Sequence, residues 1–329
     1  MDLGLSGFDP SLVWLAQAIN AKWARFSINV LDDMGASADR LDELFHYAHG
    51  AGCKCLLDAT GTMGQFAAMV TSHHDPDDWQ RAVGVYIERS LSLLRRHPEI
   101  DTLEVWGSAD IPIIVGGRGP QFDASTILAR VYQEVKEAMP WLRVASCGYG
   151  INAETTFLQC GLAEHAPTSF DLYNTHPLLW PGENLESSAA RYRSRLHDAR
   201  VLLKQRCADQ PLTVGCFGIP TVRGVPPPEL NIGTHWQLPG GVRGVDYAEA
   251  HLWYREMAQV FEEAGALFCC FEAHDVMRGG LYRHWQGACG LLTEKGSPKD
   301  FLYPLTEWAQ DRAPFDMELE DVSGAPTDS

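Results

Sequence analysis

A carboxylate stands in one of the most apolar stretches of this sequence: Glu272, within the run 266–273. An acidic side chain in an apolar strand is costly unless it is paired or functional. Carboxyl groups act as general acids, general bases or nucleophiles when their surroundings tune the pKa. Glu272 is therefore a candidate catalytic residue, paired with Asp110 or Glu104. The alternative, which we favour, is that it only hydrogen-bonds a ligand or Arg25, because buried charges are usually paired.

Cys216 is a candidate nucleophile, since a thiolate attacks well when its pKa is lowered. Its sequence neighbours are Val214, Gly215, Phe217 and Gly218, with no basic residue among them. Because nothing beside it would stabilise a thiolate, we interpret Cys216 as a packing thiol.

The adjacent pair His73-His74, with Asp75, has residue types that bind metal ions. Adjacent histidines on a strand or helix point in different directions, and no third ligand follows at a typical spacing. A loop leading into a helix that begins near Asp75-Pro76-Asp77-Asp78 explains the segment better. We therefore expect no metal ion and no cofactor.

The overall composition is that of a globular chain with a large core, with 45% hydrophobic and 21% charged residues. The formal charge of −17 argues against nucleic acid and anionic membrane surfaces as partners, and no apolar run approaches the length of a membrane span. The nine cysteines form no CxxC pair, which indicates reduced thiols. With no signal peptide visible in MDLGLSGFDP, we expect a cytoplasmic protein, and a domain of a longer polypeptide would look the same.

Short β-rich runs alternate with amphipathic helical stretches, which is typical of a parallel α/β architecture. Seven strands are expected at 23–30, 54–59, 102–106, 143–147, 170–176, 212–217 and 266–273, after a first strand, short or irregular, at 2–7. Single apolar stripes predict helices around 12–19, 41–48, 83–94, 189–203 and 254–264. These units predict one (β/α)8 TIM barrel over 1–312, followed by an acidic tail, 313–329, expected to be disordered. An open doubly wound sheet is the alternative, but no glycine fingerprint follows the first strand.

Five segments, in the same order along the chain, resemble the strand motifs of glycoside hydrolase clan A, most closely family 39. They are Trp23-Ala-Arg-Phe, Leu103-Glu-Val-Trp-Gly-Ser-Ala-Asp, Phe170-Asp-Leu-Tyr-Asn-Thr-His-Pro, Pro211-Leu-Thr-Val-Gly-Cys-Phe-Gly-Ile-Pro-Thr and Phe271-Glu-Ala-His-Asp. The last segment also resembles the eighth-strand motif of family 17. The resemblance runs from about Trp23 to Trp308, and it implies a barrel whose mouth binds a sugar between two catalytic carboxylates roughly 5–5.5 Å apart.

The sequence departs from the clan motifs at the two catalytic positions. Ser108 stands at the position of the acid/base glutamate and Cys216 at that of the nucleophile. A serine hydroxyl cannot protonate a leaving group as a carboxylic acid with a raised pKa does. The standard mechanism therefore does not carry over to this chain, although the resemblance still implies that Arg25, His176 and Asp275 frame the mouth.

Three hypotheses follow: a catalytically degenerate barrel that binds an oligosaccharide, a polysaccharide or a protein partner; an active glycoside hydrolase with relocated carboxylates centred on Glu272; or a barrel reused for other chemistry. We favour the first. The tryptophans Trp106, Trp180 and Trp236 suit stacking against sugar rings, with core packing as the alternative. The candidate ligand-binding residues are Arg25, Asp58, Trp106, Ser108, Asp110, His176, Cys216, Trp236, Glu272 and Asp275.

Overall fold

The computed structural model describes most of the predicted barrel and not the segments that follow several of its strands. The described residues are 1–32, 34–60, 69, 76–105, 124–148, 166–177, 184–206, 209–219, 221–222, 245–275, 289–293 and 295–312. The predicted tail, 313–329, and the His73-His74-Asp75 segment lie outside them.

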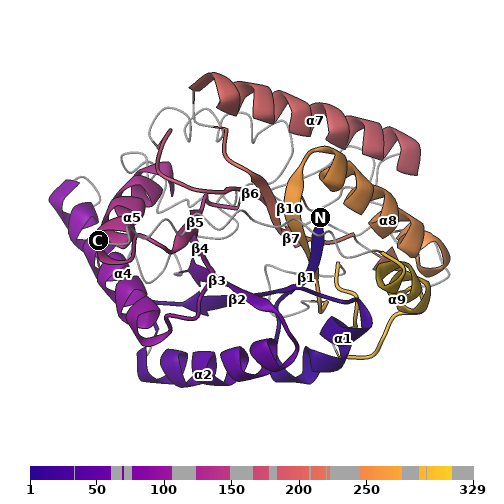
Figure 1. Cartoon of the computed structure of the whole chain (residues 1–329), viewed down its shortest axis with the longest axis horizontal. Coiled ribbons are helices and arrows are strands. Elements are labelled where there is room, and N and C mark those ends of the chain that lie inside the picture. Colours follow the sequence, from indigo (N-terminus) through magenta and orange to yellow (C-terminus); the bar gives the residue numbers. More distant parts are fainter. Residues whose placement is uncertain are drawn as a thin grey trace, which may run out of the picture.

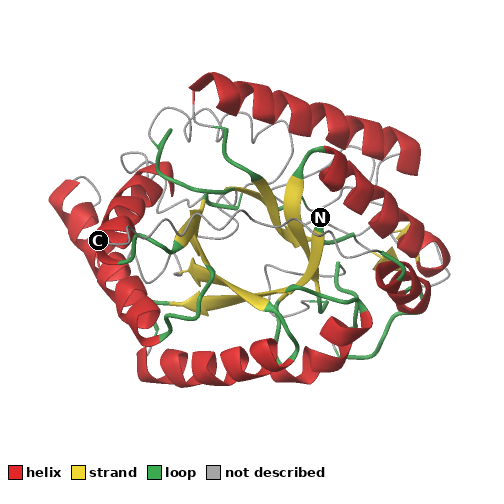
Figure 2. Cartoon of the chain, in the orientation of Figure 1, coloured by secondary structure: helices red, strands yellow, loops and turns green. Residues whose placement is uncertain are grey.

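Eight parallel strands form a barrel at the centre of the molecule (Figures 1 and 2). β1 is hydrogen-bonded to β2 on one side and to β10 on the other. A parallel bridge between Ala145 and Leu172 joins β5 to the start of β6, so the ring of strands closes. The barrel strands, in order around the ring, are β1 (Asp2–Ser6), β2 (Trp23–Asn29), β3 (Lys54–Thr60), β4 (Thr102–Val105), β5 (Arg143–Ala145), β6 (Tyr173–Thr175), β7 (Leu212–Phe217) and β10 (Ala266–Glu272).

This strand order confirms the predicted (β/α)8 barrel and excludes the open doubly wound sheet, in which the strand order would reverse. β1 is short, as expected, yet it is regularly paired along both edges. A separate pair of two-residue strands, β8 (Thr221–Val222) and β9 (Val245–Asp246), lies outside the barrel sheet.

Helices ring the outside of the barrel (Figure 2). They are the 3-10 turn η1 (Pro10–Leu12), α1 (Val13–Ala18), α2 (Met34–Gly50), α4 (Pro76–Arg96), α5 (Ala124–Ala138), α7 (Leu185–Arg206), α8 (Tyr247–Glu263) and α9 (Leu302–Gln310). All five predicted helices are present, with α5 and α9 in addition. α8 begins before its apolar stripe because the Asp246 side chain caps it, accepting a hydrogen bond from the Ala248 backbone N–H at 2.8 Å. It ends near Gly265, which has a φ of +76° that a glycine adopts without strain.

The main hydrophobic core lies between the strands and the helices. Outward-facing strand residues such as Leu5, Phe26 and Phe271 are fully or almost fully buried there. On the α8 side, the Phe217 ring meets the rings of Tyr254 and Phe261 edge-on, with centroids 5.5 and 5.2 Å apart. Burial of this apolar area is the main force that holds helices to the barrel.

A second, smaller core fills the inside of the barrel towards its amino-terminal end. Trp23, Leu56, Phe268 and Cys270 form it, and the rings of Trp23 and Phe268 stack with centroids 4.2 Å apart. Because side chains alternate along a strand, the inward position two residues after Trp23 is Arg25, and two after Cys270 is Glu272. The inside of the barrel therefore changes from apolar to polar towards the carboxyl ends of the strands.

None of the helices in the described part of the chain is both long and apolar enough to cross a membrane. Seven of the nine cysteines lie in the described ranges, and all seven are free thiols.

Candidate functional site

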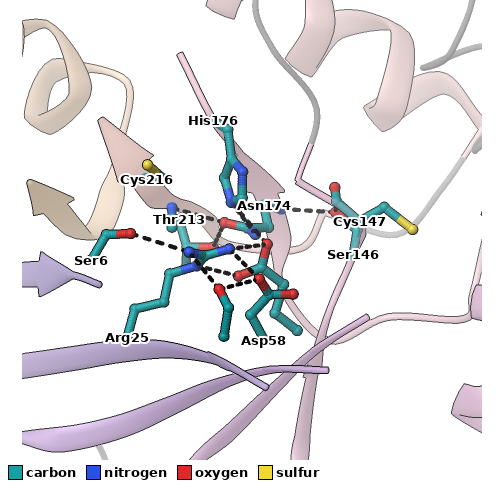
Figure 3. A network of polar contacts seen from close by, with 12 residues as sticks. Ser6, Arg25, Asp58, Ser146, Cys147, Asn174, His176, Thr213 and Cys216 are labelled. Atoms are coloured by element: carbon teal, nitrogen blue, oxygen red, sulfur yellow. Dashed lines mark hydrogen bonds and ion pairs between the residues drawn. The ribbon is translucent and has the colours of Figure 1, made fainter. Parts of the chain in front are cut away.

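Arg25 lies at the centre of a buried polar network inside the barrel (Figure 3). Its Nε donates to Glu104 Oε2 and its Nη2 to Asp58 Oδ2, both at 2.7 Å. Nη2 also reaches Glu104 Oε1 at 3.3 Å, and Nη1 donates to the hydroxyls of Ser6 and Ser27 at 3.1 and 3.4 Å. One cation from β2 thus links residues of β1, β3 and β4.

Two carboxylates share this one guanidinium, and all three groups are buried. Burial alone would raise the pKa of Glu104, but the charges of Arg25 and His176 outweigh it and lower that pKa to about 2. The same carboxylates raise the pKa of Arg25 above its usual value, against the effect of burial. Glu104 is therefore a fixed anion that holds the network together.

His176 extends the network from the end of β6. Its Nε2 lies 2.8 Å from Glu104 Oε1, and the ring fits only because two glycines leave room for it. A Cβ on Gly148 would lie 2.3 Å from His176 Cε1, and one on Gly215 would lie 2.8 Å from Nε2. The Asn174 side chain also lies against Gly215, and its Oδ1 accepts a hydrogen bond from the Gly215 backbone N–H at 2.9 Å. The imidazole position is thus fixed by the contact with Glu104 and by close backbone approach.

Cys216 and Glu272 meet across β7 and β10, with Sγ 2.8 Å from Oε2. Between Val214 and Phe217, β7 has one residue more than its partner β10 has between Cys269 and Phe271, which marks a β-bulge. The bulge turns Cys216 towards Glu272, and both side chains are half-buried.

The Cys216 thiol is protonated in this setting. Burial and the Glu272 carboxylate raise its pKa well above the usual value, and Arg25 and Ser6 only partly oppose them. The thiol therefore donates a hydrogen bond to Glu272. This arrangement supports the interpretation of Cys216 as a packing thiol, because burial and the Glu272 carboxylate outweigh the two groups that stabilise a thiolate.

Asp275 belongs to a different pair just beyond β10. Its Oδ1 lies 2.7 Å from Lys299 Nζ and accepts from the Gly290 backbone N–H at 3.0 Å. Lys299 is buried and also donates to the Thr221 hydroxyl at 2.8 Å. The pair fastens the segment after β10 to β8, so Asp275 stabilises the chain here in addition to any contact with a ligand.

Arg25, Asp58 and His176, three of the predicted ligand-binding residues, meet in one network, and Cys216 and Glu272 form a second contact. The expected hydrogen bond between Arg25 and Glu272 is not found, since Arg25 binds Asp58 and Glu104 and Glu272 binds Cys216. Four further predicted residues, Trp106, Ser108, Asp110 and Trp236, lie outside the described residues, as does Trp180.

Sequence reasoning missed four polar residues that complete these contacts: Ser6, Ser27, Asn174 and Thr213. The signal for them was available. Ser6 is at an inward position of β1, since Gly4, two residues earlier, faces Cys270 and Trp23 inside the barrel, and Ser27 follows Arg25 by two. Alternation applied to every strand would have found them.

The three carboxylates of these contacts already have hydrogen-bond partners among the described residues. Asp58 and Glu104 are committed to Arg25, and Glu272 is bound to a neutral thiol. Among the residues that the structure describes, no three His, Cys, Asp or Glu side chains are grouped in a way that could hold a metal ion.

The arrangement of the barrel is similar to that of several solved beta-glucuronidases. What they share is the (β/α)8 barrel. A Ruminococcus gnavus beta-glucuronidase superposes with a TM-score of 0.63 at 12% identity, covering 94% of this chain and 50% of that one. Those from an uncultured Clostridium sp. and from Dictyoglomus thermophilum give TM-scores of 0.62 and 0.60 at 13% and 11% identity, covering 94% and 95% of this chain and 50% of each of theirs.

The chain thus spans about half the length of these solved structures. At such identities the likeness concerns the fold. No family model matches the sequence, and no curated protein matches it.

Proposed function

We propose that this chain is a glycoside-hydrolase-like barrel that binds a carbohydrate at the carboxyl ends of its strands and does not hydrolyse it by the standard two-carboxylate mechanism. The observation that carries the proposal is the contact between Cys216 and Glu272. A protonated thiol stands near the end of the seventh barrel strand, where the clan resemblance calls for a carboxylate nucleophile. The family 39-like motifs and the fold of the solved beta-glucuronidases support a sugar as the ligand.

The polar surroundings support binding in a defined geometry. The Arg25 network and the glycines around His176 hold side chains rigidly beneath the mouth, and rigid donors and acceptors lose little entropy when a ligand binds. Binding of a protein partner in place of a carbohydrate is the alternative to this proposal. The free thiols support a reducing compartment such as the cytoplasm.

A second candidate is an active hydrolase with relocated carboxylates. It is favoured by one observation: Glu272 is a half-buried carboxylate near a strand end whose contact in the described structure is only a thiol. In such an enzyme Glu272 would act with a second carboxylate such as Asp110.

One experiment separates these candidates. A panel of aryl glycosides is assayed with the wild type and with Glu272→Gln, and sugar binding is measured on both by calorimetry. The proposal expects sugar binding by the wild type and the same background hydrolysis in both proteins. Hydrolysis by the wild type that falls at least about a hundredfold in Glu272→Gln overturns it in favour of the active enzyme. No sugar binding and no hydrolysis overturns both in favour of a protein partner.

A further inference from the structure

The charge of the ligand can be inferred from the charged side chains near the carboxyl ends of the strands. Some of these side chains already use all their hydrogen-bonding groups within the protein, and others do not. A guanidinium has five N–H donors, and Arg25 directs hydrogen bonds to five acceptor atoms, on Glu104, Asp58, Ser6 and Ser27. The Arg25 residue is only 6% exposed. Arg25 therefore has no donor left with which to bind a carboxylate on a sugar.

Lys299, a second buried cation near a strand end, is equally committed. Its Nζ binds Asp275 Oδ1 at 2.7 Å and Thr221 Oγ1 at 2.8 Å, and its side chain is fully buried. A sugar carboxylate could reach neither cation without breaking a buried ion pair, which is strongly unfavourable.

Glu272, unlike these two cations, has few hydrogen-bond partners among the described residues. Its hydrogen-bond donor among the described residues is the Cys216 thiol, a weak donor, on Oε2. Its other oxygen, Oε1, faces Gly7, where even an added Cβ would be at 3.4 Å, an ordinary contact distance. A carboxylate has about four acceptor positions. Within the described part of the chain, Glu272 thus has unused acceptor capacity, in a half-buried position where a hydrogen bond to a charged group is stronger than in water.

The formal charges of these side chains sum to a negative value. Arg25 contributes +1, while Asp58, Glu104 and Glu272 contribute −1 each, which leaves −2 with His176 neutral and −1 with it protonated. The whole chain, with a net charge of −17, has the same sign. A field of this sign attracts a cationic sugar and repels an anionic one.

From these observations we propose that the mouth binds a glycan bearing a protonated amino group, whose ammonium group binds Glu272, and that it discriminates against glycans bearing carboxylates. This inference rests on the proposed function and makes it specific, since it names the class of sugar.

The test is calorimetric binding of three tetrasaccharides: one of glucosamine, its fully N-acetylated counterpart and one of galacturonate. We expect the glucosamine form to bind at least about tenfold more tightly than the acetylated form, as for a hydrogen bond between charged groups, and the galacturonate form not to bind. Glu272→Gln should abolish the preference for the amino form.

A control variant separates this contact from general attraction by an acidic protein. Glu137→Gln removes an exposed carboxylate at the far end of α5 and should leave the preference unchanged. A thermal melt on each variant checks that it is folded.

Each remaining outcome decides the inference. Equal binding of the amino and acetylated forms, tighter binding of galacturonate, or a preference that survives Glu272→Gln overturns the inference and leaves sugar binding standing. Failure of all three sugars to bind overturns the inference, and failure of the aryl glycosides in the earlier panel to bind as well overturns the proposed function.

Discussion

The Sγ atom of Cys216 lies 2.8 Å from Oε2 of Glu272, which joins the end of β7 to the end of β10. The pair combines a thiol held in its protonated form with a carboxylate that raises the thiol pKa. A thiol nucleophile needs the reverse, a neighbour that takes its proton or stabilises the thiolate.

Cys216 should therefore be inert to alkylation. At pH 7.5 we expect iodoacetamide to modify it at least about tenfold more slowly than a free cysteine, because each unit of pKa increase lowers the thiolate fraction tenfold. Peptide mass spectrometry measures the rate, and the unfolded protein gives the reference. Glu272→Gln should raise the rate, since it removes one of the two causes of the pKa increase. Alkylation of folded Cys216 at the reference rate would revive it as a nucleophile.

Removing the Arg25 guanidinium should be among the most damaging single changes to the barrel. Arg25→Met removes the buried cation that Asp58 and Glu104 share, and we expect the free energy of unfolding to fall by about 3–5 kcal/mol. Urea denaturation measures this. The control is Arg96→Met, which removes an exposed cation that also contacts two carboxylates, Asp39 and Asp42, and should have little effect. A similar decrease in the free energy of unfolding in the two variants would show that the effect of Arg25 does not depend on its burial.

The network should also give the fold a distinct sensitivity to acid. The pKa of Glu104 is lowered from 4.5 to about 2 in the folded state, so the unfolded chain binds the proton more tightly. The stabilisation is fully present above about pH 4.5 and is lost as the pH falls towards 2, a change of about 3 kcal/mol. Glu104→Gln cannot titrate, so the stability difference between it and the wild type should shrink over this range. Urea midpoints at a series of pH values measure the difference, and a constant difference would contradict the assigned pKa.

The barrel and the inward polar residues could be predicted from sequence because both depend on period-2 alternation in short apolar runs. Arg25, Asp58 and Glu104 occupy inward positions that follow from the pattern of each strand alone. Cys216 shows the limit of this reasoning. Counting by twos from Thr213 makes Gly215 inward and Cys216 outward, and only the bulge against β10 brings Cys216 to Glu272. A bulge depends on the partner strand, which the sequence of β7 does not contain.

The partners of Arg25 show a second limit. From the sequence, a ligand or Arg25 is the alternative hydrogen-bond partner of Glu272, and in the structure Arg25 is not its partner. The register places Asp58 opposite Glu104 and Ser27 opposite Asp58, so the nearest carboxylates lie on β3 and β4. Choosing among several inward acids needs the tilt and register of the strands, which set distances of a few ångströms.

Two glycines lie close to the His176 ring, so a larger residue at either position should affect both the stability of the barrel and sugar binding at its mouth. Gly148→Ala places a methyl group 2.3 Å from the imidazole Cε1, so the ring must leave its position beside Glu104. We expect a loss of about 1–3 kcal/mol in the free energy of unfolding, as for overpacking in a core, together with weaker sugar binding. Gly50→Ala, at the end of α2 with no atom within 4 Å of the added Cβ, is the matched control and should change neither quantity appreciably. Full binding by Gly148→Ala would show that His176 does not need its present position.

Removing Lys299 from its buried pair with Asp275 should make the protein more stable as the pH falls, which is the opposite of the pH dependence expected for Glu104. Burial raises the pKa of Asp275, and Lys299 is the largest influence that lowers it. In Lys299→Met the carboxyl group loses that influence, so its folded-state pKa rises further above the unfolded value. Stability of the variant should then increase as the pH falls through this raised pKa, because the folded state binds the proton more tightly. The variant should be strongly destabilised at pH 7, where Asp275 must be charged or take up a proton, and closer to the wild type at pH 5. Urea denaturation at the two pH values measures this, and Lys299→Met/Asp275→Asn, in which nothing at the site titrates, should lose the pH dependence. An equal deficit at both pH values in the single variant would mean that Lys299 acts through packing of its methylene groups and not through its charge.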